Sequence, residues 1–332
     1  MSSSPAALDH PAPAGPAQDV RAVVLAGGLA YERDVSLRSG RRVAEALRQA
    51  GVETRILDAD ADLLAALAAD PADALFIALH GAAGEDGSLR SVLELAGIPF
   101  VGTAAGSCRI AWDKPSAKAA VRAAGARTPD WVALPHSTFR ELGAGAVLDL
   151  ISARLGLPLI VKPAQGGSAL GVELIGSAGD LPSAMVSCFA YADTVLVERF
   201  VAGTEVAVSV LDGPAGPRAL PAVEIDPASG VFDYAARYTP GMTTYHTPAR
   251  LPAGVLHAVE DLAVTVHRTL GLRDLSRTDA IVGADGCVHF LEVNVSPGMT
   301  ETSMLPMAVA AAGLDLGATL RGLVSAAVAR SG

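Results

Sequence analysis

The sequence has few cysteines, no excess of positive charge and no long apolar runs, and each absence excludes a class of protein. Cys108, Cys188 and Cys287 are far apart and match no zinc-binding or redox spacing, so we expect small buried residues in a reducing compartment. The formal net charge of −10 argues against nonspecific nucleic-acid binding. Because no apolar run is long enough to span a membrane, we expect a cytoplasmic protein without a membrane or nucleic-acid partner.

Length and composition indicate several folded domains after a short tail. Residues 1–19 are rich in Ser, Pro, Ala and Gly and have neither a basic start nor an apolar segment, which predicts a disordered tail and not a signal peptide. The 332 residues are 51% hydrophobic, which is ample for real cores. We expect domains over residues 20–104, 105–203 and 204–332.

Strands and helices alternate in the first of these domains. Apolar strands are predicted at residues 20–25, 53–57, 74–79 and 98–102, with helices at 36–50 and 89–96. This alternation predicts an α/β fold with a doubly wound parallel sheet. Ligands of such sheets bind at the carboxyl ends of the strands, where this chain has Gly27-Gly28 and His80-Gly81.

The rest of the chain mixes short strands with a few helices. The predicted strands are residues 159–162, 172–175, 195–198 and 205–211, and the predicted helices are 114–125, one from about 180, 254–270 and an amphipathic one after 307. Residues 233–248 are predicted to be irregular.

A hairpin near the C-terminus is the most informative feature. Residues 283–286 read Gly-Ala-Asp-Gly between two apolar strands, which is a hairpin turn signal. If the turn is centred on its two middle residues, Arg277 lies opposite Glu292 and Asp279 lies opposite Phe290.

Strand alternation then gathers polar groups on one face of this hairpin. The four residues on that face are Arg277, Asp279, Glu292 and Asn294. Two carboxylates and an amide oxygen are hard ligands suited to Mg²⁺, and the cation is a partner for phosphate. The alternative is an exposed face with one Arg–Glu pair. The loop at residues 296–298 follows at once and favours a ligand site.

A second candidate site is the glycine-rich segment that follows Lys162. Glycines at 166, 167 and 171 allow backbone N–H groups to surround phosphate oxygens, although many such loops are only tight hairpins. It is not a Walker A loop, because the lysine precedes the glycines. Lys114 is a second candidate phosphate contact. Glu198 and Glu205 are candidates to accept hydrogen bonds from ribose or adenine, or else exposed glutamates beside a turn.

Together these residues resemble the D-alanine–D-alanine ligase family of the ATP-grasp superfamily. The resemblance runs in order from about residue 20 to the C-terminus. Its most specific segments are Gly27-Gly28 with Glu32-Arg33-Asp34-Val35-Ser36, His80-Gly81 with Gly84-Glu85-Asp86-Gly87, Asp113-Lys114, Lys162-Pro163 with Gly167-Ser168, and Glu292-Val293-Asn294 through Ser296-Pro297-Gly298-Met299-Thr300. The resemblance implies a two-lobed ATP-grasp module after the N-terminal domain.

The resemblance also implies an activity. An ATP-dependent, ADP-forming ligase would phosphorylate the carboxylate of one D-alanine, and the amine of a second would attack the acyl phosphate to give D-alanyl-D-alanine for peptidoglycan precursors. The cofactors implied are ATP and two Mg²⁺ ions, with Mn²⁺ as an alternative, and the implied assembly is a homodimer. The open alternatives are the same chemistry on another amino-acid pair and a non-catalytic binding protein, which would not need the hairpin residues intact. A nucleotide-dependent oxidoreductase fails because no G-x-G-x-x-G follows the first strand.

The resemblance assigns roles to individual residues. Those implied to bind ATP are Lys114, Lys162, Ser168, Glu198 and Glu205, and those implied to bind metal are Asp279, Glu292 and Asn294. Those implied to bind the amino acids are Glu32, His80, Arg277, Ser303 and Met304. Those implied to act in catalysis are Glu32, Ser168, Tyr238, Arg277 and Gly298, with Glu32, Ser168 and Tyr238 fastening a mobile loop over the site.

The sequence departs from the family pattern at a few positions. Arg237 stands where the family usually has lysine, which keeps the charge but changes its geometry. Gly166 and Ala169 replace more polar residues of the phosphate loop, and Ala280 replaces a bulkier hydrophobic residue. His246 is an additional candidate for substrate specificity.

Overall fold

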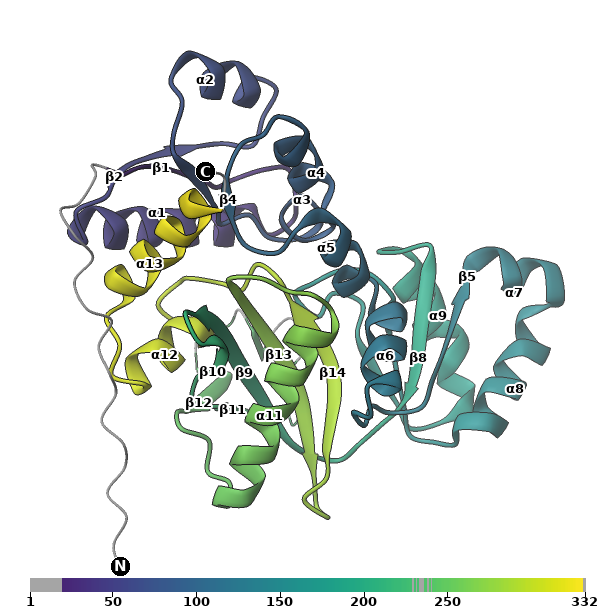
Figure 1. Ribbon diagram of the computed structural model, residues 1–332. Coiled ribbons are helices and arrows are strands. Elements are labelled where there is room, and N and C mark those ends of the chain that lie inside the picture. Colours follow the sequence, from purple (N-terminus) through teal and green to yellow (C-terminus); the bar gives the residue numbers. More distant parts are fainter. Residues whose placement is uncertain are drawn as a thin grey trace, which may run out of the picture.

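The computed structural model describes residues 20–228, 230, 232, 236–237, 239 and 241–330. In those residues the strands form three sheets, and the α/β class predicted from the sequence is confirmed. The N-terminal sheet lies at the top of Figure 1, the largest sheet lies below it, and the third sheet lies to the right. The predicted N-terminal tail lies outside the described residues.

The N-terminal sheet is parallel throughout, with the order β2-β1-β3-β4. Its strands are β1 Arg21–Leu25, β2 Glu53–Leu57, β3 Ala74–Ile77 and β4 Phe100–Val101. Helices α1 (Arg33–Gln49) and α13 (Leu316–Ala329) cover one face, and α2 (Leu63–Ala69) and α4 (Ser88–Leu95) cover the other. The predicted doubly wound parallel sheet is therefore confirmed.

Alternation along these strands explains why both faces are covered. Val24 and Phe76 belong to the core that includes α1 and α13, whereas Val23 and Leu75 belong to the core on the opposite face. All four are essentially buried, which is typical of a parallel sheet between two helical layers.

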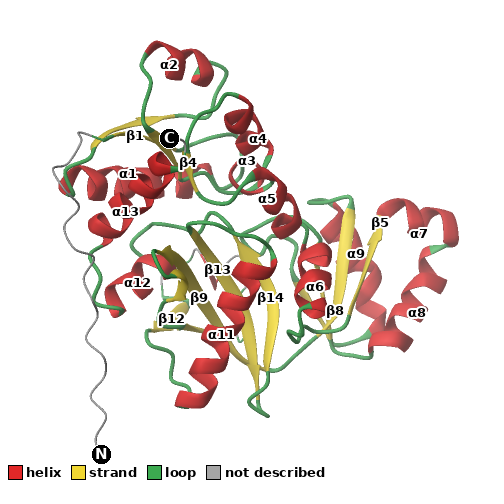
Figure 2. Ribbon diagram, viewed as in Figure 1, coloured by secondary structure: helices red, strands yellow, loops and turns green. Residues whose placement is uncertain are grey.

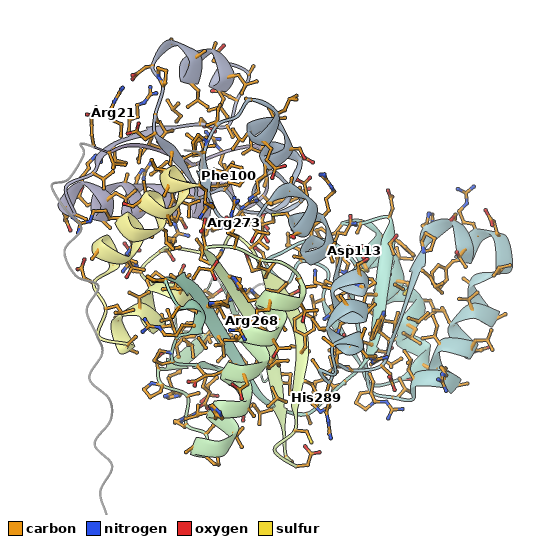
Figure 3. All side chains as sticks on the ribbon, viewed as in Figure 1. Arg21, Phe100, Asp113, Arg268, Arg273 and His289 are labelled. Carbon is orange, nitrogen blue, oxygen red and sulfur yellow. The ribbon has the colours of Figure 1, made fainter. Side chains whose placement is uncertain are left out.

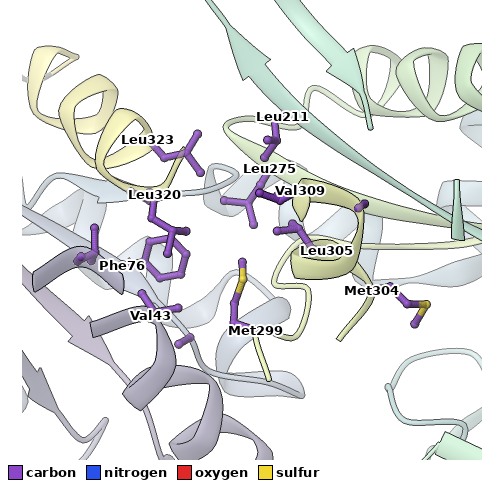
Figure 4. Packing of buried hydrophobic residues seen from close by; sticks show 14 of the residues in the cluster. Val43, Phe76, Leu211, Leu275, Met299, Met304, Leu305, Val309, Leu320 and Leu323 are labelled. Atoms are coloured by element: carbon purple, nitrogen blue, oxygen red, sulfur yellow. The ribbon is translucent and has the colours of Figure 1, made fainter. Parts of the chain in front are cut away.

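The C-terminal helices connect the largest sheet to the N-terminal sheet, because one packs on β9 and β11 and the last returns to β3 and β4, which the sequence did not predict. The single helix predicted after residue 307 is two, α12 (Met304–Ala311) and α13. Figure 4 shows Met299 and Leu305 close to Phe76 and Leu320 in one shared core. The Ser296 hydroxyl also lies within hydrogen-bond distance of the Ile77 and Leu79 carbonyls, so the segment between β14 and α12 is held against the carboxyl end of β3.

Polar contacts reinforce this junction. The Arg330 guanidinium donates to both carboxylate oxygens of Asp274 at 2.7 Å and to the Phe100 carbonyl at 3.2 Å. The Arg273 guanidinium lies 5.1 Å from the centre of the Phe100 ring (Figure 3). The N-terminal sheet and the largest sheet are thus fixed to each other by buried charge as well as by apolar packing.

The third sheet is antiparallel, with the order β5-β8-β6-β7. Its strands are β5 Trp131–Pro135, β6 Leu159–Pro163, β7 Glu173–Ile175 and β8 Thr194–Arg199. Helices α7 (His136–Leu142), α8 (Ala144–Leu155) and α9 (Leu181–Phe189), with the 3₁₀ turn Ala178–Asp180 before α9, cover one face. Leu159 and Val161 of β6 point into that core, so Ile160 and Lys162 point to the other face.

The largest sheet has the order β12-β11-β9-β13-β14, with β10 paired to β9. Its strands are β9 Gly203–Gly213, β10 Gly216–Ala219, β11 Val223–Pro227, β12 Thr243–His246, β13 Leu275–Gly283 and β14 Val288–Asn294. Helices α5 (Ala105–Trp112), α6 (Lys114–Ala123) and α11 (Ala253–Thr269) pack against it, and α6 and α11 are seen beside its strands in Figure 2.

Some sequence expectations are corrected by these elements. Residues 243–246 are an edge strand, so the prediction that the whole of 233–248 is irregular was wrong there; β12 pairs with β11, a partner that the local sequence does not reveal. Cys108 and Cys188 are buried as predicted, but Cys287 is half-buried, and all three are free thiols. No single helix among the described residues is long and apolar enough to cross a membrane, although the bent pair α12 and α13 reaches that length and composition together.

Candidate active site

The β13–β14 hairpin does gather its polar residues on one face, but in a different register from the predicted one. Arg277 lies opposite Asn294 and Asp279 lies opposite Glu292. The predicted pairing was therefore wrong by two positions. Because side chains alternate with a period of two, a shift of two leaves all four residues on the same face.

A β-bulge produces this arrangement. Ala280 pairs with Phe290 and Asp279 pairs with Glu292, so Leu291 is the extra residue on β14. Without the bulge, Glu292 would lie opposite Thr278 and point to the core face of the sheet. The single extra residue therefore puts the second carboxylate beside the first.

Basic residues surround these carboxylates. Arg277 donates two hydrogen bonds to Asp279, at 2.7 and 2.8 Å, and the Lys114 ammonium lies 3.4 Å from Glu292. Burial alone would raise the pKa of the Glu292 carboxyl, but Lys114, Lys162 and other nearby cations lower it to about 2. Glu292 is therefore an anion at every physiological pH.

The same face offers oxygen ligands that fit a divalent cation. Asp279 and Glu292 both line the larger of two adjoining cavities, and the Asn294 side-chain oxygen accepts from the Ser296 N–H at 2.7 Å. Carboxylate and amide oxygens held close together on a rigid hairpin are the donor set that Mg²⁺ prefers.

A buried ion-pair network lies behind the larger cavity. Lys162 donates a hydrogen bond to one carboxylate oxygen of Glu198, and the Lys118 ammonium lies 2.8 Å from the other oxygen. Burial lowers the pKa of Lys118 to about 8 against the attraction of Glu198. Lys118 also donates to Thr128 at 2.7 Å. Both Glu198 oxygens are thus occupied by lysines, which the sequence did not predict.

Lys118 is a residue that sequence reasoning missed. It stands four positions after Lys114 on α6, so the two lysines share one helix face. That spacing was the available signal. Its side chain is fully buried, whereas an unpaired surface lysine would be exposed.

The larger cavity has the polarity of a nucleotide site. It lies between the third sheet and the largest sheet, and its apolar wall includes Ile160, Phe200 and Leu291. Its charged lining residues are Lys114, Lys162, Glu198, Arg199, Glu205, Arg237, Asp279 and Glu292. All of the residues predicted to contact ATP except Ser168 line this cavity. Burial, with help from Asp279 and Glu292, raises the pKa of Glu205 to about 7 although Arg237 lowers it.

The glycine-rich segment after Lys162, which we call the glycine loop, contributes to both cavities: Gly166 and Gly167 line the larger one, and Gly167 and Ser168 line the smaller one. Lys114 donates to the Gly166 carbonyl at 2.7 Å, which fixes the start of the loop, and Ser168 donates to Glu32 at 3.0 Å. Ser168 and Ala169 have positive φ values of 58° and 55°, so two non-glycine residues are held in the left-handed region. The loop therefore touches the N-terminal domain. Tyr238, the predicted third member of this set, lies outside the described residues.

The smaller cavity is lined by the residues predicted to bind amino acids. These are Glu32, His80, Arg277, Ser303 and Met304, and Gly298, Ser168 and Asn294 line it as well. Distant parts of the chain meet there: the start of α1, the segment after β3, the glycine loop, the β13–β14 hairpin and the segment before α12. Glu85 also lines it and is a second residue to which the sequence reasoning gave no role.

His80 is fixed by two hydrogen bonds. Its Nδ1 is 3.0 Å from the Ser296 carbonyl and its Nε2 is 3.1 Å from the Ser39 hydroxyl. A carbonyl only accepts, so Nδ1 carries the proton and Nε2 accepts from Ser39. Burial lowers the pKa of His80 to about 4, so the ring is neutral at pH 7.

The segment after β14 has a tight local structure. The Ser303 hydroxyl accepts from the Thr300 N–H at 2.9 Å, and a Cβ on Gly298 would lie 2.6 Å from that hydroxyl oxygen. A side chain at 298 would therefore displace the Ser303 hydroxyl. In the part of the chain that the structure describes, the Gly298 N–H donates to no other group, which leaves it available to a ligand.

His246 is not brought to either cavity. It lies on β12, with Nε2 3.6 Å from Asp226 and close to Glu224. Arg250 already pairs with both of these carboxylates, so the group is an ion-pair cluster. By contrast, Arg237 lines both cavities and its guanidinium lies 4.4 Å from the centre of the Phe232 ring.

Family models match most of the chain. One described as D-ala D-ala ligase C-terminus matches residues 120–325, and one described as D-ala D-ala ligase N-terminus matches residues 60–103. Among curated proteins, a D-alanine--D-alanine ligase of Anaeromyxobacter dehalogenans is 44% identical over 89% of this chain and 92% of that protein. One of Bordetella petrii is 40% identical over 92% of each.

Solved structures are similar over nearly the whole chain. D-alanine--D-Alanine Ligase from Bacillus anthracis has a TM-score of 0.79 and 31% identity, covering 94% of this chain and 98% of that one. The same ligase complexed with ATP has a TM-score of 0.77 and 29% identity over the same shares of the two chains. VanG D-Ala:D-Ser Ligase from Enterococcus faecalis has a TM-score of 0.79 and 28% identity, covering 93% of this chain and 100% of that one.

Proposed function

The chain belongs to the D-alanine–D-alanine ligase family and has the ATP-grasp fold, and we propose that the two cavities described above carry out its reaction. It is an ATP-dependent ligase that joins two D-alanines into D-alanyl-D-alanine for peptidoglycan precursors.

ATP binds in the larger cavity. Lys114 and Lys162 neutralise its phosphates, and the N–H groups of the glycine loop contact phosphate oxygens. Glu205 accepts from the ribose or the adenine. Glu198 acts differently from the sequence expectation: it holds Lys162 in place through the ion pair, because both of its oxygens are already occupied by lysines.

Asp279, Glu292 and Asn294 hold Mg²⁺, with Mn²⁺ as an alternative. When bound, the metal balances the negative charge that crowds together as a phosphoryl group moves toward a carboxylate. The Glu292 carboxylate, an anion held beside Asp279 by the bulge, supports this assignment. Arg277 remains paired with Asp279 and keeps it oriented.

The first D-alanine binds in the smaller cavity, with its ammonium at Glu32. One oxygen of its carboxylate attacks the γ-phosphorus of ATP, so ADP leaves and an acyl phosphate forms. This step is needed because a free carboxylate is a poor electrophile. Neutral His80 packs against this substrate without competing for its negative charge.

The second D-alanine then reacts. Its amine, after losing a proton, attacks the acyl carbon, and Arg277 and the Gly298 N–H stabilise the tetrahedral oxygen. The C–O bond to phosphate breaks, which releases inorganic phosphate and the dipeptide. Ser303 receives the carboxylate of the second D-alanine, and Met304 packs against its side chain.

The glycine loop closes the site. The hydrogen bond from Ser168 to Glu32 joins the loop to the N-terminal domain, so the loop spans both cavities. With Tyr238 as a third partner, such a closure excludes water that would hydrolyse the acyl phosphate. Arg237 supplies charge at the same boundary, in place of the family's usual lysine.

Domain boundaries near residues 104 and 203, a homodimer and a cytoplasmic location complete the proposal. A cytoplasmic location follows from the need for ATP. Light scattering coupled to size-exclusion chromatography measures the mass of the assembly.

One observation supports the residue assignments above all others. Arg277 lines the smaller cavity and is bonded to Asp279, so the proposed metal ligands adjoin the proposed amino-acid site at this residue. The second amino acid is the open choice, because a D-Ala:D-Ser ligase is among the similar structures. Phosphate release is measured with ATP, Mg²⁺ and D-alanine alone, then with D-alanine plus D-serine or D-lactate. We expect D-alanine alone to support full turnover; turnover only with a mixed pair would move the chain to the alternative.

A further inference from the structure

Glu85 is a buried carboxylate that the proposed reaction does not yet use. It ends the short helix α3 (Ala82–Glu85), is 7% exposed, and lines the smaller cavity. Its Oε1 accepts from the Gly81 N–H at 3.0 Å. Among the described residues, its other oxygen accepts no hydrogen bond, so that oxygen is available to a ligand in the cavity.

No described cation forms an ion pair with Glu85. The nearby Arg90 donates to the Gly84 carbonyl, and Arg277 is bound in two places to Asp279. Burial, with help from Glu32, raises the pKa of Glu85 to about 7, although the Gly81 N–H, Arg277 and Arg90 lower it. His80, which also faces the cavity, is neutral and supplies no countercharge. A buried carboxylate without a partner is costly, so a positively charged ligand at this position is favoured.

A second carboxylate lies beside it. A Cβ on Gly81 would lie 2.8 Å from Glu32 Oε2, and the N–H of the same Gly81 is bound by Glu85. Glu32 and Glu85 therefore border one residue from two sides. The Glu32 Oε1 atom accepts from the Ser168 hydroxyl, whereas Oε2 is the oxygen that lies next to Gly81. Two carboxylates this close repel each other unless a cation lies between them.

We propose that Glu85 is a second ammonium-binding carboxylate, and that its free oxygen acts with Glu32 to bind the ammonium of the first D-alanine. This inference rests on the proposed function, because it needs an amino acid in the smaller cavity. A tetrahedral ammonium has three N–H donors, so it can bond to both carboxylates at once. The pair also rejects acids that lack an α-amino group.

The test is Glu85→Gln. Glutamine keeps the volume and keeps an oxygen that accepts from the Gly81 N–H, so only the charge is lost. With ATP and Mg²⁺ saturating, initial rates against D-alanine concentration are fitted with separate Michaelis constants for the two D-alanine sites. We expect the constant of the first site to rise about tenfold or more, since a hydrogen bond to a charged group is lost. The constant of the second site, the ATP constant and kcat should change less than about twofold.

The pH dependence separates binding from a structural role. In the wild-type enzyme the first-site constant should rise as the pH falls from 8 to 6, because protonation of Glu85 removes its charge. This rise should be absent in Glu85→Gln. The matched control is Asp86→Asn, which changes the adjacent carboxylate; Asp86 accepts from the Ser88 N–H and does not line the smaller cavity.

The outcomes are distinct. An unchanged first-site constant in Glu85→Gln, or an effect confined to the second site, overturns the inference while leaving the ligase function intact. The inference is also overturned if Glu85→Gln has a lower thermal midpoint at pH 8 and its first-site constant depends on pH as in the wild type. That combination indicates that Glu85 has a structural role only. Absence of D-alanine-dependent phosphate release in the wild-type enzyme refutes the proposed function itself.

Discussion

His80 should make the protein's stability depend on pH in a way that a substitution can isolate. Its ring is buried between Ser39 and Ser296, and its pKa falls from 6.5 to about 4 in the folded chain. The unfolded chain therefore binds a proton between pH 6.5 and 4 that the folded chain does not. The free energy of unfolding therefore keeps its full value above pH 6.5 and decreases as the pH falls from 6.5 to about 4. From pH 7 to pH 5 the loss is about 2 kcal/mol, at about 1.36 kcal/mol per pH unit.

The assay is thermal unfolding of the wild-type protein and His80→Gln at pH 7 and pH 5. Glutamine does not titrate, so the stability difference between the two proteins should shift by about 2 kcal/mol in favour of the variant on acidification. His257→Gln is the matched control, because His257 is exposed on α11. An unchanged difference between wild type and His80→Gln would refute the assignment of a buried neutral imidazole.

Other substitutions test the remaining contacts. Glu292→Gln should reduce Mg²⁺-dependent turnover by about 100-fold or more, through loss of an anionic ligand, with little effect on the circular-dichroism spectrum; near-normal turnover at saturating Mg²⁺ would contradict the metal assignment. Ser168→Ala removes the loop's bond to Glu32 and should raise ATP hydrolysis without dipeptide, measured as the ratio of phosphate to dipeptide; a constant ratio would contradict the loop's role. Lys118→Met leaves Glu198 with one buried lysine partner and should destabilise the protein by about 3 kcal/mol in denaturant unfolding, whereas a change below about 0.5 kcal/mol would show that the pair is not buried as described.

The face of the β13–β14 hairpin that carries the proposed metal ligands was predictable. Which face a side chain lies on depends on whether its position along the strand is odd or even, and a pairing shifted by two residues does not change this. Arg277, Asp279, Glu292 and Asn294 share a face in any pairing that differs by an even number of residues. The register itself was not predictable, because the turn near residue 284 and the bulge at Leu291 shift it by one position each. Neither shift leaves a clear mark on the local sequence.

Contacts between distant segments could not be read from the sequence. Lys118 looks like a surface lysine until α6 packs on β14 and buries it beside Glu198. Strand β12 forms only because β11 offers it an edge, and α13 packs on the N-terminal sheet some 300 residues from β1. In each case the burial or pairing comes from tertiary packing, which overrides the local pattern.

The amino-acid residues were predictable mainly through resemblance to a family. Glu32, His80 and Ser303 stand far apart in sequence, and nothing in their spacing predicts that they line one cavity. Glu85 lies in the segment Gly84-Glu85-Asp86-Gly87, but its burial and its free oxygen appear only in the fold, so the sequence does not predict its role. His246, which sequence reasoning offered for specificity, lies in a separate ion-pair cluster.

We expect this chain to join two D-alanines through an acyl phosphate, and the fate of one carboxylate oxygen tests this most directly. D-Alanine labelled with oxygen-18 in its carboxylate is incubated with the enzyme, ATP and Mg²⁺, and the inorganic phosphate and the dipeptide are analysed by mass spectrometry. We predict one labelled oxygen in the phosphate for each dipeptide formed, because the C–O bond of the acyl phosphate breaks. Dipeptide formed without label in the phosphate would contradict a reaction through an acyl phosphate.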